Sequence, residues 1–176
     1  MAKNNNTLFI IAAIIAAVIL STPILLTTAQ KYFVDQLHTA YRKKFQHLIA
    51  KIEQMGYSVI PTSGYRSFQE QANLWMENKK NAMPGLSHHN YGLALDINLQ
   101  KGVELWRKST AKEEWMKTGV PQLAKALGFS WGGDYNSYHD PVHFYIPLDT
   151  KKLLSTAYTQ FGNDPSNVKG NEVKIV

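Results

Sequence analysis

Residues 93–99 read LALDINL and alternate strictly between large aliphatic side chains and small or polar ones. Successive side chains of a β-strand point to opposite faces of the sheet, so the four aliphatic residues share one face and Asp96 lies on the other. Residues 142–146, VHFYI, alternate in the same way and separate His143 from their apolar residues. The two segments predict strands with one buried face and one face that carries polar groups.

An amphipathic segment precedes these strands. Between Val34 and Met55 the apolar residues recur at steps of three or four, which predicts one continuous helical face. Gly56 follows as a helix stop signal. Residues 57–60 then form a short strand candidate that ends at Pro61.

Helical patterns also separate the candidate strands. Ser67 and Glu70 form a capping box, which starts a second helix. A third helix is expected over residues 112–127, where Pro121 is a candidate break. Residues 81–91 are expected to form a loop. Helices that precede strands favour an α+β fold, with a small antiparallel sheet flanked by helices.

The amino-terminal segment has no polar face. Residues 8–20 are apolar without a break, and the run resumes at residues 24–26. Thirteen apolar residues suit a signal peptide, with small residues before Gln30 for cleavage. The run through Leu26 would instead reach about 28 Å as a helix, close to the roughly 30 Å of a bilayer core. Residues 1–29 are therefore expected to be a signal peptide or a hydrophobic helix that anchors the chain in a membrane.

The remaining chain is large enough for one domain, expected over residues 30–161, with a loose polar tail over residues 162–176. Cysteine is absent, so any metal must be bound by His and carboxylate groups. The net charge of +6 suits contact with anionic polymers or phospholipid, or serves solubility alone. No helix combines a basic stripe with interleaved aromatics, so a nucleic-acid partner is not expected.

Two imidazoles and one carboxylate carry the candidate chemistry. His89 precedes the strand that carries Asp96, and His143 lies on the other strand. An aspartate flanked by leucines on a short strand is costly to bury unless it is paired or bound to a metal. The three side chains match a Zn²⁺ ligand set with an open fourth position, which is typical of catalytic zinc sites. A hydrogen-bonded His–Asp pair explains the same spacing, and both interpretations remain open at this point.

Three elements carry a resemblance to a known family. Residues 87–96, SHHNYGLALD, fit the S-x-H-x-x-G-x-A-x-D signature of the zinc D-alanyl-D-alanine carboxypeptidase and L-alanyl-D-glutamate endopeptidase group. Residues 63–67, SGYRS, and residues 140–143, DPVH, resemble that group's S-G-Y-R-S and acid-x-x-His elements. The elements occur in the family order. The resemblance implies a zinc site on the face of the sheet.

The resemblance also implies a role for single residues. His89, Asp96 and His143 correspond to the zinc ligands. Asp140 corresponds to the general base that takes a proton from the zinc-bound water, and His139 is a nearby alternative. Arg66 corresponds to the group that steadies the oxyanion or a substrate carboxylate.

Three neighbours of the first histidine ligand have more modest expected roles. Ser87 is expected either to contact a ligand or the substrate, or simply to cap its loop. His88 fills an unspecified position of the signature and is read as a bystander. Gly92 is expected to meet a backbone requirement at the entry to the strand.

The family cuts peptidoglycan stem peptides. Asp140, where many carboxypeptidases carry Glu, and residues 131–134, WGGD, resemble the phage endolysin-like branch, which favours cleavage between L-Ala and D-Glu. The alternatives are a D,D-carboxypeptidase that removes terminal D-Ala and an inactive, zinc-bearing wall-binding domain. A monomer is expected, exported to the periplasm or cell envelope and, if the leader is retained, anchored in the membrane.

Overall fold

The computed structural model describes residues 25–175. Its strands form one antiparallel sheet in the order β1-β2-β5-β4, and β3 pairs with β2 beyond the end of β5. The strands are β1 (Ser58–Ser63), β2 (Ala94–Lys101), β3 (Glu104–Trp106), β4 (Ser130–Trp131) and β5 (His143–Tyr145). The predicted α+β class and small antiparallel sheet are confirmed.

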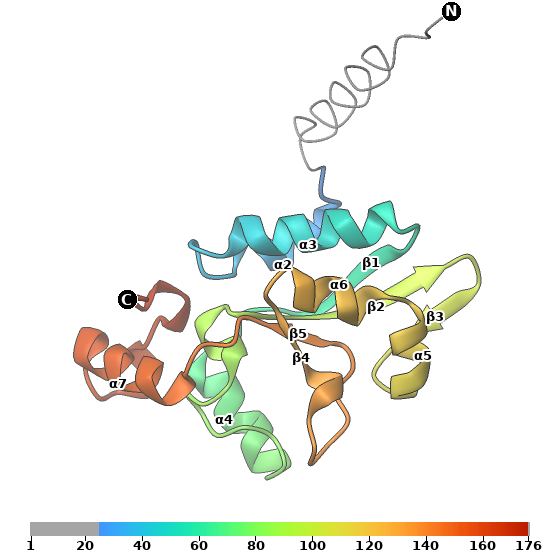
Figure 1. The fold of residues 1–176 in the computed structure, drawn as a ribbon. Coiled ribbons are helices and arrows are strands. Elements are labelled where there is room, and N and C mark those ends of the chain that lie inside the picture. The colour runs from blue at the N-terminus through green and yellow to red at the C-terminus, as the bar shows by residue number, and fades with distance from the viewer. Residues whose placement is uncertain (1–24, 176) are drawn as a thin grey trace, which may run out of the picture.

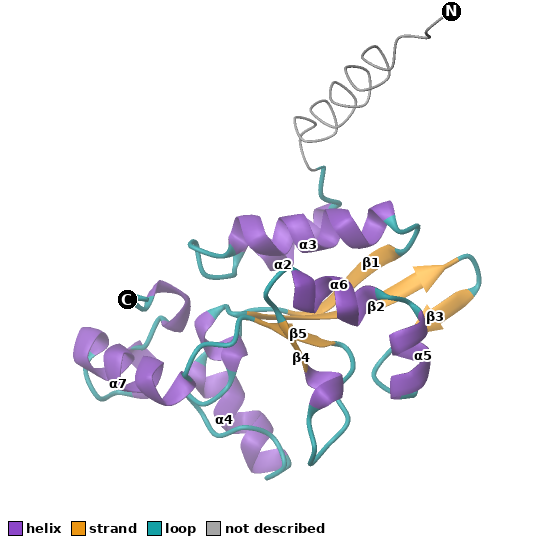
Figure 2. Ribbon diagram, viewed as in Figure 1, coloured by secondary structure: helices purple, strands orange, loops and turns teal. Residues whose placement is uncertain are grey.

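Helices lie on both sides of this sheet (Figure 1). The α-helices are α2 (Thr28–Asp35), α3 (Arg42–Gln54), α4 (Phe68–Glu77), α5 (Lys112–Lys117), α6 (Val120–Ala126) and α7 (Thr150–Phe161). Short 3-10 helices are η1 (His88–Tyr91), η2 (Gly132–Asp134), η3 (Pro165–Asn167) and η4 (Gly170–Glu172). Helices α2, α3 and α6 lie over one face, whereas α4 lies on the opposite side, as does the loop that follows η2 (Figure 2).

The hydrophobic core lies between the sheet and the helices of the first face. The apolar residues of β2 predicted from the alternation are all buried, and so is Phe144 of β5. Phe45, Leu48 and Ile52 of α3 are buried in the same cluster. The opposite face of the sheet is therefore left to carry Asp96 and His143.

The continuous helical face expected from Val34 to Met55 is wrong in one respect, because the chain forms two helices. Helix α2 ends at Asp35 and α3 begins at Arg42. In the intervening turn, the backbone N–H of His38 donates a hydrogen bond to the carbonyl of Gly92, at 3.0 Å. The His38 side chain also bonds to the carbonyl of Val173, at 2.9 Å. These tertiary bonds replace the helical ones, while Val34 and Leu37 remain buried.

Proline is accommodated at two places where the sequence suggested a boundary. Strand β1 continues through Pro61 to Ser63, with an irregular register between the two, because an edge strand tolerates a missing N–H. The third predicted helix divides at Gly119, which has φ of 74° and precedes α6, and not at Pro121. Pro121 lies in the first turn of α6, where its missing N–H costs little.

The expectation of a loose tail after Phe161 is also wrong. Val168 and Val173 are buried in the core cluster, and η4 packs against η1. A Cβ atom on Gly170 would overlap the carbonyl of Asn90, so the two backbones are in direct contact. The tail thus braces the short helix that carries His89.

The hydrophobic leader lies largely outside the described residues, and so does the helix expected there. Within residues 25–175, none of the helices has the length and apolar character needed to cross a bilayer. The described part begins just before Thr27, which caps α2 through reciprocal hydrogen bonds with Gln30. Residues 28 and 29 therefore belong to α2 and so to the folded domain.

Candidate metal centre

Asp96 and His143 face each other across two neighbouring strands. They are direct partners in the register of β2 and β5, next to the pair formed by Leu95 and Phe144. Since side chains alternate along a strand, the Leu95–Phe144 pair points into the core and the Asp96–His143 pair points to the opposite face. The predicted alternation therefore brings together two residues that are far apart in the sequence.

His89 reaches the same point from η1, immediately before β2. The Ser87 hydroxyl caps η1 by accepting a hydrogen bond from the N–H of His89, at 3.3 Å. At the other end, Gly92 has φ of 61°, and a Cβ atom there would lie 2.5 Å from the backbone nitrogen of His38. The predicted backbone requirement at Gly92 is confirmed, because only glycine allows both this conformation and this close approach.

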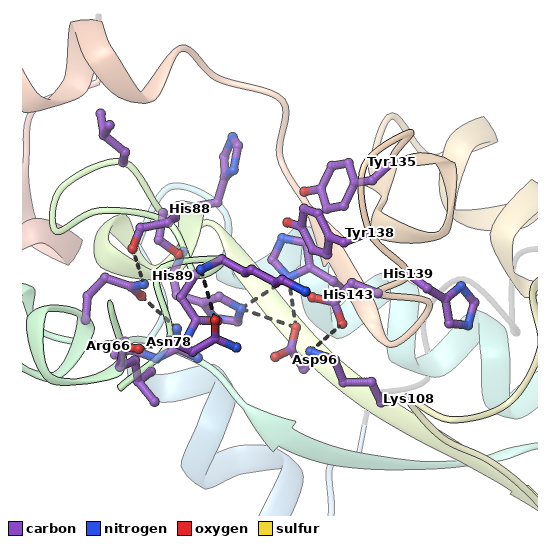
Figure 3. Close-up of a pocket in the computed structure, with 18 residues that line it drawn as sticks. Arg66, Asn78, His88, His89, Asp96, Lys108, Tyr135, Tyr138, His139 and His143 are labelled. Carbon is purple, nitrogen blue, oxygen red and sulfur yellow. Dashed lines mark hydrogen bonds and ion pairs between the residues drawn. The ribbon is translucent and has the colours of Figure 1, made fainter. Parts of the chain in front are cut away.

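The donor atoms of the three residues converge on one point (Figure 3). His89 Nε2 lies 3.2 Å from Asp96 Oδ1 and 3.1 Å from His143 Nδ1, and His143 Nδ1 lies 2.8 Å from Asp96 Oδ1. Zinc bonds of about 2.0–2.1 Å in a tetrahedral site separate donor atoms by about 3.3 Å. The observed separations are slightly shorter, so a small closed-shell cation fits with little movement.

The protonation of His89 supports the same interpretation. Its Nδ1 lies 2.6 Å from the carbonyl of Gly64, and a carbonyl oxygen only accepts hydrogen bonds. Nδ1 therefore carries the proton, which leaves a lone pair on Nε2. That lone pair faces Asp96 and His143, whose facing atoms can also donate lone pairs to a metal. A single proton on His143 satisfies only part of this cluster, whereas a cation satisfies all of it.

The electrostatic environment keeps Asp96 ionised. Burial by itself raises its pKa, but His89 and His143 outweigh burial and hold the pKa of Asp96 well below its usual value. The carboxylate is thus available as an anionic ligand at neutral pH. Both histidines are buried, with 4% and 7% of their surface exposed, so bulk water competes little for the site.

A cavity of about 460 Å³ opens above these donors, between α4 and the loop that joins η2 to β5. Arg66, Ser87, Asp140 and the three donor residues all border it. Arg66 is fixed by hydrogen bonds to Gln71 (2.7 Å) and Ser63 (3.0 Å). Burial lowers the pKa of its guanidinium, but an arginine remains cationic at neutral pH. The Arg66 guanidinium is therefore a fixed positive charge in the wall of the cavity that the donors border.

Asp140 lies three residues before β5 begins, and its backbone carbonyl accepts a hydrogen bond from the N–H of His143. Its Oδ1 is buried and accepts no well-aligned hydrogen bond, although Lys108 Nζ lies 3.2 Å away. An acceptor in this state is ready to take a proton from a molecule that enters the cavity. Asp140 borders the same cavity as the three donors, and its role as the base remains a prediction.

The neighbouring histidines have other partners. His139 Nε2 bonds to the carbonyl of Thr110, at 2.8 Å, which disfavours it as the alternative base. His88 Nε2 bonds to the carbonyl of Leu148, and its ring packs against Tyr145 at 4.3 Å between centroids. His88 borders the same cavity, and its role as a bystander remains a prediction.

The sequence reasoning missed several residues that shape the cavity. Tyr135 and Tyr138 border it, and their rings pack 4.8 Å apart between centroids. Burial raises the pKa of both phenols, so each keeps its O–H as a donor at neutral pH. Their place just before the DPVH element was a usable signal. Lys108, by contrast, lies in a connection that carried no pattern.

Comparisons with known proteins agree with this geometry. A family model described as D-alanyl-D-alanine carboxypeptidase matches residues 80–146, which include the three donors and Asp140 but not Arg66. The peptidoglycan L-alanyl-D-glutamate endopeptidase CwlK of Bacillus subtilis (strain 168) is 36% identical over 121 residues, which cover 61% of this chain and 71% of CwlK.

A solved structure shares the fold. The L-Ala D-Glu endopeptidase ChiX of Serratia marcescens superposes with a TM-score of 0.52 at 15% identity, covering 78% of this chain and 93% of that chain. Together with the relative from Bacillus subtilis, the family model identifies the chain. It belongs to the M15 peptidase family and is a metallopeptidase that acts on peptidoglycan.

Proposed function

We propose that this protein is a zinc-dependent endopeptidase that cuts the L-Ala–D-Glu bond of peptidoglycan stem peptides. The observation that carries the proposal is the convergence of His89 Nε2, Asp96 Oδ1 and His143 Nδ1 at a cavity that Asp140 also borders. The 36% identity to an enzyme named for this bond supports the choice of substrate.

The three donors would hold the zinc ion on the polar face of the sheet. When bound, zinc lowers the pKa of a coordinated water to about 7 and polarises a carbonyl oxygen. Asp140 takes the proton from the attacking water and delivers it to the amine nitrogen that leaves. Arg66, held by Gln71 and Ser63, stabilises the negative charge that develops on the scissile carbonyl oxygen. Ser87 borders the same cavity and is proposed to contact the substrate.

The shape of the site favours an endopeptidase over a carboxypeptidase. A second, shallow and widely open cavity, of about 510 Å³, lies beyond Asp96 and is bordered by Thr62, Asn98 and Arg107. Asp96 thus has open space on both sides. An enzyme that cuts within a peptide must hold residues on both sides of the bond, whereas removal of one terminal residue needs little room on one side.

Mass spectrometry of digested muropeptides tests the proposal. A new free amine on D-Glu is expected, and loss of a single D-Ala would instead assign a D,D-carboxypeptidase. Asp140→Asn should retain zinc and lower kcat by roughly 10²–10⁴-fold, because it removes only the proton acceptor. His143→Ala should lose the metal. Intact stem peptides in the presence of fully zinc-loaded protein would indicate an inactive wall-binding domain.

We further propose that the leader exports the domain to the cell envelope and, if retained, anchors it in the membrane. The placement of the capping box supports a boundary before Thr27, because cleavage before Gln30 would remove the cap of α2. Loss of such a cap costs about 1 kcal/mol. Fractionation of membrane and soluble material, followed by sequencing of the mature amino terminus, tests both points. Full-length protein found only in the cytosol would contradict export, and a terminus at Gln30 would contradict the boundary.

A further inference from the structure

Lys108 lies on the connection between β3 and α5, beside the metal centre (Figure 3). Its Nζ atom is 3.2 Å from Asp140 Oδ1, while 68% of its side chain is exposed against 15% for Asp140. Lys108 and Asp96 both border the cavity of about 460 Å³ and the one of about 510 Å³. The ammonium group therefore stands where the two cavities meet, next to the expected base.

The backbone that carries Lys108 is firmly held. The N–H groups of Arg107 and Thr110 bond to Thr110 Oγ1 (3.0 Å) and to the Arg107 carbonyl (2.9 Å). The indole N–H of the fully buried Trp115 also donates to the Arg107 carbonyl, at 3.2 Å. His139 bonds to the Thr110 carbonyl, which ties this connection to the loop of Asp140. The backbone on both sides of Lys108 is thus held relative to the loop of Asp140, while the Lys108 ammonium group stays accessible.

The chemistry of the proposed reaction places a carboxylate near this ammonium group. Asp140, as the group that protonates the leaving amine, has to contact the amine nitrogen. A glutamyl residue that is joined onward through its side-chain carboxyl keeps its α-carboxylate free, two bonds from that nitrogen. A cation within 3.2 Å of Asp140 can therefore reach this carboxylate.

We propose that Lys108 binds the free α-carboxylate of the residue whose amine leaves, and so selects substrates that carry this charge. The inference rests on the proposed function and adds a specificity residue outside the three sequence elements. The other cations are less suited to the task. Arg66 is already assigned to the scissile carbonyl oxygen, and Arg107 borders only the cavity beyond Asp96. Lys80 borders the cavity of about 460 Å³, but among the described residues only Lys108 forms an ion pair with Asp140.

The test compares two synthetic peptides that contain L-Ala–D-Glu linked onward through the side-chain carboxyl, one with a free and one with an amidated α-carboxyl. The wild-type enzyme is expected to cut the free acid with a kcat/KM about tenfold higher than the amide. Lys108→Met should reduce this ratio to within twofold of one, and Lys108→Arg should preserve it. Lys117→Met is the matched control, because Lys117 is 70% exposed and also pairs with an acid, Glu114.

The ratio separates substrate binding from an effect on Asp140. If Lys108 acted only through Asp140, Lys108→Met would change kcat/KM for both peptides equally, and the unchanged ratio would overturn the inference. If the enzyme releases D-Ala and leaves L-Ala–D-Glu intact, the endopeptidase proposal fails. The same comparison is then made with D-Ala–D-Ala peptides that have a free or amidated terminus, where an unchanged ratio in Lys108→Met again overturns the role of Lys108.

Discussion

Gly132 offers a sharp test of how the metal centre is held. It lies in η2, and a Cβ atom at this position would be 2.5 Å from the carbonyl oxygen of Asp140 and 2.9 Å from the Cβ of His143. Ordinary contact begins near 3.4 Å, so the side chain of Gly132→Ala would press on both residues. The backbone of Gly132 does not have a positive φ, and the effect is therefore purely steric.

The expected effect follows from these overlaps. The Asp140 carbonyl would have to move by about 0.9 Å and the His143 Cβ by about 0.5 Å to restore contact distance. Misplacement of a reacting group by about 1 Å costs roughly 10²-fold in rate, and overpacking costs about 1–3 kcal/mol in stability. We therefore expect kcat/KM on stem peptides to fall about 10²-fold. Zinc content and thermal unfolding measured on the same samples show whether the fold and metal survive.

Gly102→Ala is the matched control. Gly102 has φ of 59°, and a Cβ atom there would meet nothing within 4 Å. The substitution should cost roughly 1–2 kcal/mol in stability through backbone strain alone and leave kcat/KM unchanged. Wild-type activity in Gly132→Ala would refute the steric argument, and so would an equal loss of activity in the two variants.

Two further predictions concern stability. Burial, aided by the charge of His143, lowers the pKa of His88 to about 4 from 6.5, so in metal-free protein the unfolded chain takes up this proton first. The contribution of neutral His88 to the free energy of unfolding is therefore complete above pH 6.5 and is lost as the pH falls toward 4. The melting temperature of the metal-free protein should decline over this range, and His88→Phe should flatten the decline. An identical decline in the variant would contradict the prediction. Val173→Ala, at a residue 1% exposed, should lower the free energy of unfolding by about 2 kcal/mol, whereas Val103→Ala, at a residue 100% exposed, should change it by less than about 0.5 kcal/mol. Equal denaturation curves for the two valine variants would show that the tail is not part of the core.

The strands and the donor cluster were predictable because their signal is local and periodic. Alternation in residues 93–99 and 142–146 fixes which side chains share a face, and the observed register then pairs Asp96 with His143. The helix after Ser67 was predictable for a similar reason, since its capping box lies within four residues. A carboxylate and an imidazole on the polar face of such strands indicate a candidate site, but their spacing alone fits a metal site and a hydrogen-bonded pair equally.

The features that escaped prediction depend on contacts between distant segments. The turn between α2 and α3 exists because His38 bonds to Gly92 and Val173, neither of which is near it in sequence. A role for Lys108 could not be predicted, because only the fold brings it next to Asp140, 32 residues later in the sequence. Helix α7 is a different case, because its cap is local: the Asp149 side chain accepts hydrogen bonds from the N–H groups of Lys151 and Lys152.

The contact between Gly170 and Asn90 has a consequence for synthesis of the protein. A nascent chain emerges from the ribosome with its amino terminus first, so η1 emerges well before the segment around Gly170 that supports it. A polypeptide interrupted before Gly170 would contain every signature residue and still lack the brace behind His89. Stalled or clipped products would therefore bear the motif of a wall hydrolase without its fully supported centre.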